Sequence, residues 1–300
     1  MVVTTATLWG FSGSLSKFVM AAGVTPLAIS QGRSVVTAGL LLVYLLAARR
    51  PALRVDRRTL AWLVLFGVLL ATVQVMYFSA IQRLNVATAI LLEYLAPAMV
   101  VAFAWIFQGR RATVVTVGAL VAALAGCALV VEAYDLEVLS LSGAGVAFGI
   151  GAAVSFSGYI LTGEHLQSRV GVAPRLFYGF AVSAVTLAFL QPPWNIPAAV
   201  VAPRNLALIA AVGVFGTLVP FGCFLAALRY LDAGRATIVS TLEPVVAGVV
   251  SFVWFGEAFS LPQLLGAALV IGAVIALQRD RPAEEAVAAP EAVIFTQSEV

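Results

Sequence analysis

The amino-acid sequence alternates long apolar stretches with short breaks that carry charges, glycines or prolines. A helix needs about 20 mostly apolar residues to cross a membrane. Ten such stretches occur, at Val3–Ala22, Pro26–Ala47, Leu60–Gln82, Leu84–Phe107, Ala112–Val131, Ser142–Gly163, Ala173–Gln191, Asn205–Tyr230, Leu231–Trp254 and Leu261–Gln278. Only 10% of the 300 residues are charged, too few to cover the water-exposed surface of a soluble domain. The sequence therefore predicts an all-α membrane protein with ten transmembrane helices.

The second half of the chain repeats a pattern of the first half. A Glu-containing segment ends in Pro97, and a second one ends in Pro244, 147 positions later. At the same offset Ala80 aligns with Ala227 and Gly109 with Gly256, without a gap. Five helices per copy is an odd number, so the second copy is inserted upside down relative to the first. We expect two inverted five-helix repeats, at residues 1–131 and 142–278, followed by a disordered cytoplasmic tail at 279–300.

The arginines indicate how the helices are oriented. With the N-terminus in the cytoplasm, the inner loops hold thirteen arginines and the outer loops hold two, Arg83 and Arg204. Basic residues collect in cytoplasmic loops, so both termini are predicted to be cytoplasmic. The inner set is Arg49, Arg50, Arg54, Arg57, Arg58, Arg110, Arg111, Arg169, Arg175, Arg229, Arg235, Arg279 and Arg281. Because these arginines occupy short loops, the net charge of +3 does not indicate nucleic-acid binding.

Four ionisable residues lie well inside predicted helices: Lys17, Arg33, Glu93 and Glu243. A charge at the centre of a bilayer costs about 3 kcal/mol on insertion scales, so such residues usually serve a function. One interpretation is a polar cavity in which Glu93, with Lys17 or Arg33, binds the charged head of a solute and Glu243 couples transport to protons. The alternative is that Lys17 and Arg33 only neutralise Glu93 or cap carbonyls, or that Lys17 snorkels to the interface.

Further residues are candidates for the same cavity. Pro97, Pro220 and Pro244 predict hinges, because proline removes a backbone hydrogen bond from a helix; simple packing bends are the alternative. Candidate substrate-binding side chains are Trp9, Tyr77, Tyr94, Tyr159 and Phe224 among the aromatics, and Gln74 and Ser240 among the polar residues. Each of these could instead serve helix packing. The spacings Gly118 to Gly126 and Gly266 to Gly272 favour close packing of the fifth and tenth helices.

Several classes of site are missing from the sequence. It has no phosphate-binding Gly-Lys-Ser/Thr loop, no His/Cys/Asp metal cluster and no nucleophile elbow. Its two cysteines, Cys127 and Cys223, form no motif. We therefore expect no cofactor, no metal and no enzymatic activity.

The motifs resemble a known family. Trp9-Gly10 with Lys17, Arg33, and the segments LEYLAPAMVVAFAWIFQG and TLEPVVAGVVSFVWFGE are similar to the drug/metabolite transporter superfamily, in its paired-repeat EamA branch. The resemblance implies a multi-pass carrier of the bacterial inner membrane, with a central cavity, that exports small metabolites such as amino acids. Many family copies end the fourth helix with Gly-Glu. The second copy here has Gly256-Glu257, but the first has Gly109-Arg110.

We therefore predict a secondary transporter that moves amino acids or related metabolites outward by alternating access. Its partners are a small-molecule solute, the lipid bilayer and, as one candidate coupling ion, the proton; the expected assembly is a monomer or weak dimer. Three alternatives stay open: a broad-specificity drug exporter, an intramembrane enzyme acting on lipid-linked substrates, and a non-transporting sensor or assembly subunit.

Overall fold

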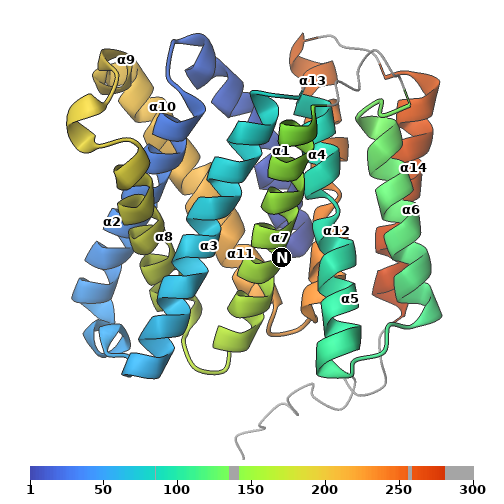
Figure 1. The fold of residues 1–300 in the computed structure, drawn as a ribbon, viewed down its shortest axis with the longest axis horizontal. Coiled ribbons are helices and arrows are strands. Elements are labelled where there is room, and N and C mark those ends of the chain that lie inside the picture. The colour runs from blue at the N-terminus through green and yellow to red at the C-terminus, as the bar shows by residue number, and fades with distance from the viewer. Residues whose placement is uncertain (85, 135–141, 256–258, 281–300) are drawn as a thin grey trace, which may run out of the picture.

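A computed structural model describes residues 1–84, 86–134, 142–255 and 259–280, apart from the side chains of a few helical residues. All regular elements in these ranges are helices, which confirms the predicted all-α class (Figure 1). The first half contains α1 (Val2–Ala21), α2 (Pro26–Ala48), η1 (Arg50–Leu53), α3 (Arg57–Ile81), α4 (Val86–Glu93), α5 (Ala96–Gln108) and α6 (Val114–Val130). The second half contains α7 (Gly143–Leu166), α8 (Val172–Leu190), η2 (Pro193–Asn195), α9 (Ala198–Val201), α10 (Pro203–Gly213), η3 (Val214–Leu218), α11 (Val219–Ala227), α12 (Ala233–Ser240), α13 (Glu243–Phe255) and α14 (Leu261–Arg279).

Short polar side chains begin many of these helices. Their oxygen atoms accept hydrogen bonds from backbone N–H groups that have no partner in the first helical turn. Ser260 adds a capping box, because Gln263 returns a hydrogen bond to its backbone N–H. Such caps precede six helices, at Thr25, Asp56, Thr113, Ser142, Asp232 and Ser260.

The described residues include eight helical segments that are long and apolar enough to cross a membrane. They are Pro26–Ala48, Arg57–Ile81, Thr88–Gln108, Gly143–Leu166, Val172–Leu190, Pro203–Ala227, Ala233–Val250 and Leu261–Arg279. α6 is apolar but has only 17 residues, and α1 has 20. Each of the ten predicted stretches therefore contains a helix, whereas the number of membrane crossings stays a prediction. Most of the predicted tail, residues 281–300, lies outside the described residues.

Three of the predicted stretches are interrupted. The fourth stretch divides into α4 and α5 at Tyr94-Leu95, and the ninth divides into α12 and α13 at Thr241-Leu242. These two breaks are 147 positions apart, the same offset as the duplication. The eighth stretch contains a π-helical turn, η3, next to Pro220. Prolines and π turns are common sites of helix distortion. The three interruptions lie close to Pro97, Pro220 and Pro244, whose role as hinges stays a prediction.

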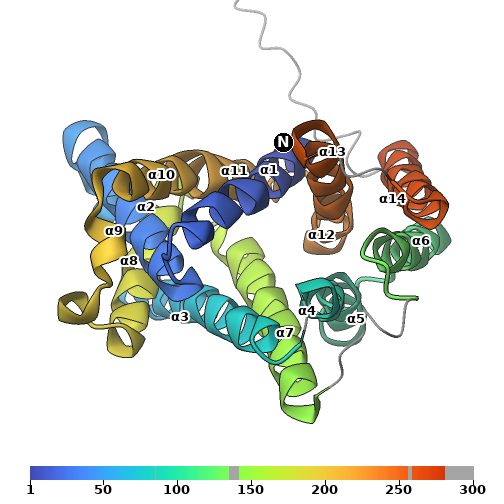
Figure 2. The same cartoon turned by 90° about the horizontal axis from the view of Figure 1, so that it is seen from above.

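The helices pack in pairs that relate the two halves of the chain. α2 packs on α8 at one end of the bundle, and α6 packs on α14 at the other. Between these pairs, α1 lies against α12 and α13, while α7 lies against α4 and α5 (Figure 2). The first helix of each half thus packs on the broken helix of the other half.

Glycines allow α6 and α14 to approach closely. A Cβ atom at Gly126 would lie 2.6 Å from the Gly266 carbonyl oxygen, and one at Gly266 would lie 2.6 Å from that of Gly126. A Cβ atom at Gly118 or Gly272 would meet nothing within 4 Å. The predicted packing role is thus seen for Gly126 and Gly266, whereas Gly118 and Gly272 face open space.

Gly126→Ala is expected to destabilise the protein by about 1–3 kcal/mol, because the added methyl group collides with backbone atoms that cannot rotate away. This loss corresponds to a melting temperature lower by about 5 °C in detergent. Gly118→Ala, on the same helix, is the matched control. It should leave melting unchanged or raise it, since alanine favours helices over glycine by about 1 kcal/mol. Equal melting of the two variants would contradict the close packing of α6 on α14.

Candidate functional site

The two broken helices bring carboxylates to the centre of the bundle. Glu93 is the last residue of α4, and Glu243 is the first residue of α13. α4 and α13 lie in the upper half of the bundle, whereas α5 and α12 lie in the lower half, so the two broken helices run in opposite directions (Figure 1). Pro97 and Pro244 cannot donate a backbone hydrogen bond, so the carbonyl groups four residues earlier lose their helical partner. The middle of the bundle therefore combines two carboxylates with irregular, polar backbone.

Arg33 on α2 is held in place by Gln74 on α3. Its Nε and Nη2 atoms donate to the Gln74 Oε1 atom at 3.2 and 2.8 Å. The Nε2 atom of Gln74 donates in turn to the Leu70 carbonyl oxygen and to Ser183 Oγ, both at 3.3 Å. The amide of Gln74 is thus occupied by protein groups, and it positions the guanidinium group.

Arg33, Glu93 and Glu243 interact electrostatically with one another, and Tyr77 and Tyr94 interact with both carboxylates. No described carboxylate forms an ion pair with Arg33. All five side chains are partly exposed. They are therefore candidates for contact with a solute.

Helix α1 approaches the second break closely. A Cβ atom at Gly10 would lie 2.8 Å from the Glu243 carbonyl oxygen and 3.0 Å from the Ala247 nitrogen. At the offset of 147, Gly10 corresponds to Ser157, which donates from Oγ to the carbonyl oxygen of Ala96 at 3.3 Å. Ala96 is itself the counterpart of Glu243. In both halves, therefore, a small residue of the first helix contacts the equivalent carbonyl group of the other half's broken helix.

Three predicted aromatic residues belong to one cluster. The Trp9 ring lies 5.0 Å from Phe221 and 5.8 Å from Phe224. Tyr159 lies 6.0 Å from Phe221 and stacks on Phe66 at 4.5 Å. Phe224 and Tyr159 are completely buried, so in this conformation they pack against neighbouring side chains rather than face a solute. The Trp9 Nε1 and Tyr159 hydroxyl groups have no described hydrogen-bond partner.

The remaining predicted residues have different environments. Ser240 ends α12, is buried, and donates to the Thr237 carbonyl oxygen at 2.7 Å. Pro97 and Pro244 follow the two breaks directly, and Pro220 accepts a hydrogen bond from Thr5 at its carbonyl oxygen. The side chain of Lys17 lies outside what the structure describes. The described residues contain no His/Cys/Asp/Glu group that could hold a metal ion.

Comparison with known proteins gives the family. The model of the EamA-like transporter family matches the chain twice, at residues 1–132 and 143–278. The chain belongs to this family. One solved crystal structure has the same fold, with a TM-score of 0.78 and 20% identity over 92% of this chain and 94% of the other.

Several curated proteins match this chain over most of their length. The uncharacterized inner membrane transporter YicL of Salmonella typhimurium is 26% identical over 93% of this chain and 94% of its own. The threonine/homoserine exporter RhtA of Salmonella typhimurium is 26% identical over 87% and 82%, respectively. The pseudopaline exporter CntI of Pseudomonas aeruginosa is 29% identical over 81% and 83%.

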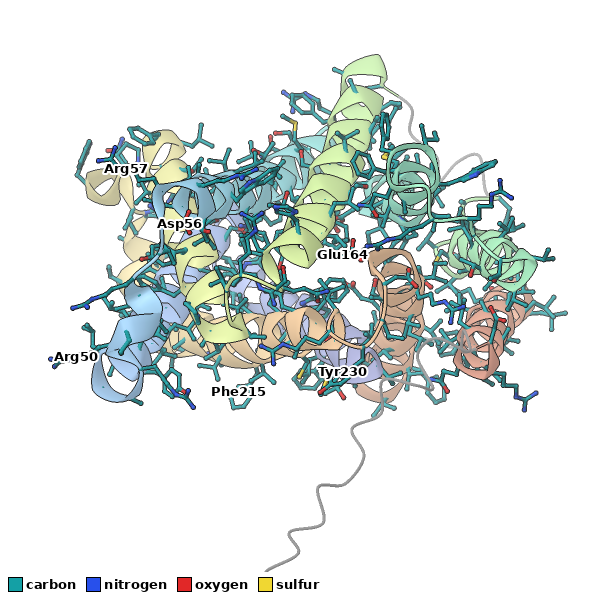
Figure 3. All side chains as sticks on the ribbon, turned by 90° about the horizontal axis from the view of Figure 1, so that it is seen from below. Arg50, Asp56, Arg57, Glu164, Phe215 and Tyr230 are labelled. Carbon is teal, nitrogen blue, oxygen red and sulfur yellow. The ribbon has the colours of Figure 1, made fainter. Side chains whose placement is uncertain are left out.

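A second polar cluster lies at the lower end of the bundle, the end that faces the viewer in Figure 3 and carries Arg50 and Glu164. We call this end of the bundle the basic end. Arg110, just after α5, forms an ion pair with Glu164 on α7 at 2.7 Å. Glu164 also accepts a hydrogen bond from the Ala233 N–H that opens α12, at 3.3 Å. This carboxylate therefore connects α5 and α7 with α12.

Asp280 accepts further polar contacts at the basic end, from Arg235 and from Thr113. Arg235 on α12 forms ion pairs with Asp232 at 3.5 Å and with Asp280 at 2.9 Å. Thr113, which caps α6, also donates to Asp280 at 2.9 Å. The start of α12, the start of α6 and the end of α14 are thus held together.

Sequence reasoning missed this cluster and treated Arg175 and Arg235 as loop residues. Both are instead buried within helices. Arg175 donates to the carbonyl oxygens of Gly163 and Leu225, so it joins the ends of α7 and α11 to α8. The hydropathy pattern places these arginines near helix ends but cannot show which carbonyl groups they meet. Glu164 did carry a signal, since it is an acid at an end that is otherwise strongly basic.

Gly10→Ala is expected to reduce transport by about tenfold, because the new methyl group displaces the Glu243 peptide. The measurement is the initial rate of solute efflux from proteoliposomes, with melting temperature followed in parallel. Gly39→Ala is the control, since a Cβ atom there meets nothing within 4 Å. Unchanged transport in Gly10→Ala would show that the close approach of α1 does not position Glu243.

Proposed function

We propose that this EamA-like protein is a secondary transporter that exports amino acids or closely related zwitterionic metabolites across the inner membrane. Its ten spans form two inverted repeats, residues 1–131 and 142–278, with both termini in the cytoplasm. The names of RhtA and CntI support export, and that of YicL supports the inner membrane. The observation that carries the proposal is the electrostatic interaction of Arg33 with Glu93 and Glu243, two carboxylates that lie at the breaks of two oppositely directed helices.

The charges suit a solute with two oppositely charged ends. Glu93 lies at the C-terminal end of α4, where the helix dipole is negative and a bound cation is favoured. Arg33 has no described ion-pair partner, and Gln74 holds its guanidinium group, which interacts electrostatically with both carboxylates. Glu93 would bind an ammonium group and Arg33 a carboxylate, while Tyr77 and Tyr94 line the space between them. Glu243, at the positive N-terminal end of α13, is the candidate proton-coupling group.

Substitution of the two carboxylates tests these roles. Glu93→Gln is expected to raise KM for efflux by about tenfold or more, because a charge-assisted hydrogen bond to the ammonium group is lost. Glu243→Gln is expected to flatten the dependence of efflux on pH. Both are measured in proteoliposomes after a screen of amino acids and related metabolites identifies a transported solute.

Glu132→Gln, in the loop after α6, serves as the control and should behave as the unmodified protein. If both central variants keep their rate and pH dependence, the assigned roles are wrong. Chemical conversion of a supplied solute without net movement would instead favour the intramembrane enzyme.

Alternating access requires one end of the bundle to open while the other closes. The contacts of Glu164 and Asp280 hold the ends of α5, α7, α12 and α14 together at the basic end. We infer that the structure represents a state closed at this end, and that the contact between the two halves, Arg110 with Glu164, breaks when the end opens. Arg110 belongs to the first half, whereas Glu164 belongs to the second half. Their ion pair therefore joins the parts that must separate.

Arg110→Gln and Glu164→Gln are each expected to change the efflux rate by about two- to fivefold, since an exposed ion pair contributes up to about 1 kcal/mol. The double variant should change little beyond either single variant, because both remove the same interaction. The glutamine introduced in Glu164→Gln keeps an oxygen for the Ala233 N–H, so the charge alone is tested. Arg111→Gln, at the neighbouring exposed position, is the control. Additive effects of the two substitutions would show that the pair does not gate transport.

A further inference from the structure

The turn between α2 and α3 carries an uncompensated positive charge. Residues 49–58 contain five exposed arginines, Arg49, Arg50, Arg54, Arg57 and Arg58. None of them forms an ion pair with a carboxylate in the described part of the chain. The one acid of the turn, Asp56, accepts hydrogen bonds from the Arg58 and Thr59 N–H groups at 3.1 Å, and hydrogen bonding to Thr59 lowers its pKa. Asp56 is thus occupied as the cap of α3, and no carboxylate in the described part of the chain compensates the arginines.

A shallow cavity of about 370 Å³ lies in this turn and is lined by Leu46, Arg50, Pro51, Leu53 and Arg54. Its lining combines three apolar residues with two arginines. Arg50 donates from Nε to the Leu46 carbonyl oxygen at 2.7 Å, which holds its side chain beside the apolar wall. The Tyr178 hydroxyl group donates to the Leu53 carbonyl oxygen at 2.7 Å and fastens the turn to α8. The general enrichment of basic residues in cytoplasmic loops explains why arginines occur in this turn. It does not explain why they line a cavity together with apolar residues.

An apolar stripe leads from this cavity along the outside of α2. Val43 and Leu46 have exposed fractions of 67% and 43%, and they precede Arg50 by seven and four positions. Val43 and Leu46 therefore share one face of α2, and Arg50 lies just beyond the end of this helix, where it donates to the Leu46 carbonyl oxygen. Figure 3 shows Arg50 at the outer edge of the bundle, pointing away from its centre. The surface facing the bilayer is thus apolar along α2 and becomes cationic at the cavity.

We propose that the turn between α2 and α3 binds one anionic phospholipid, with the phosphate group held by Arg50 and Arg54 and an acyl chain lying along Val43 and Leu46. Guanidinium groups form paired hydrogen bonds with phosphate oxygens, so arginine suits this ligand better than lysine. Basic pockets between helices at the cytoplasmic side of a membrane are a known kind of headgroup site. The continuous apolar stripe favours a lipid over free phosphate, because free phosphate has no group to place on Val43 and Leu46.

Native mass spectrometry of the full chain, titrated with phosphatidylglycerol or phosphatidylcholine in detergent, tests this site. We expect one phosphatidylglycerol to bind at least about tenfold more tightly than phosphatidylcholine, and Arg50→Gln/Arg54→Gln to remove this preference. Arg50→Lys/Arg54→Lys keeps the charge but loses the paired hydrogen bonds, and should retain only part of it. Melting temperatures establish that the variants are folded, and inorganic phosphate serves as a competitor.

The matched control is Arg169→Gln/Arg229→Gln, which removes the same charge from two other exposed residues. An equal loss of phosphatidylglycerol binding in the control would overturn the site in favour of general attraction to this end of the bundle. Displacement of the lipid by inorganic phosphate at similar concentration would overturn the lipid in favour of a small anion. Neither readout measures transport, so the result is independent of the proposed transport function.

Discussion

The structure depends on the interruption of two apolar helices at the middle of the bundle. A continuous helix satisfies all its backbone groups and offers none to a solute. Here each fourth helix is interrupted by a short turn just before its proline, after Glu93 in one half and after Ser240 in the other. The freed carbonyl groups and the carboxylates of Glu93 and Glu243 share the same region. Polar backbone at this depth is tolerated where it is buried in protein or lines a polar cavity. The helix breaks and the charged side chains therefore both favour a solute site at the middle of the bundle.

The two halves share a scaffold but not a set of charges. Gly10 and Ser157 occupy equivalent positions and touch equivalent carbonyl groups, of Glu243 and of Ala96. The side chains on those two residues differ, however, since one is a carboxylate and the other a methyl group. The proposed solute with two unlike ends needs such asymmetry, whereas the proposed rocking of two inverted halves needs a similar backbone in each. Duplication of the backbone with divergence of a few side chains would provide both.

Much of this arrangement could be predicted from the sequence, because the length of an apolar stretch and a repeated offset depend only on the order of residues along the chain. The ten helical stretches, the equivalent positions of Pro97 and Pro244, and the small residues Gly126 and Gly266 are of this kind. Contacts between particular helices could not be predicted in this way, because hydropathy does not determine how each helix is rotated about its own axis. For this reason the sequence did not show that Gln74 holds Arg33 or that Tyr159 is completely buried. It also treated Arg175 as a loop residue.

The structure explains why the first half ends its fourth helix with Gly109-Arg110 instead of the Gly-Glu ending of the second half. An acid at position 110 would repel Glu164, whereas Arg110 forms an ion pair with it at 2.7 Å. The Arg110 side chain is 54% exposed, so water screens this pair and its contribution to stability is small. Arg175, by contrast, is completely buried against the ends of α7 and α11, and losing its partners would leave a charge without compensation. An end that must open and close repeatedly needs weak, exposed contacts between the moving parts and strong, buried ones within each part. The Arg110–Glu164 pair is of the first kind, and the contacts of Arg175 with α7 and α11 are of the second kind, which fits the proposed opening of this end.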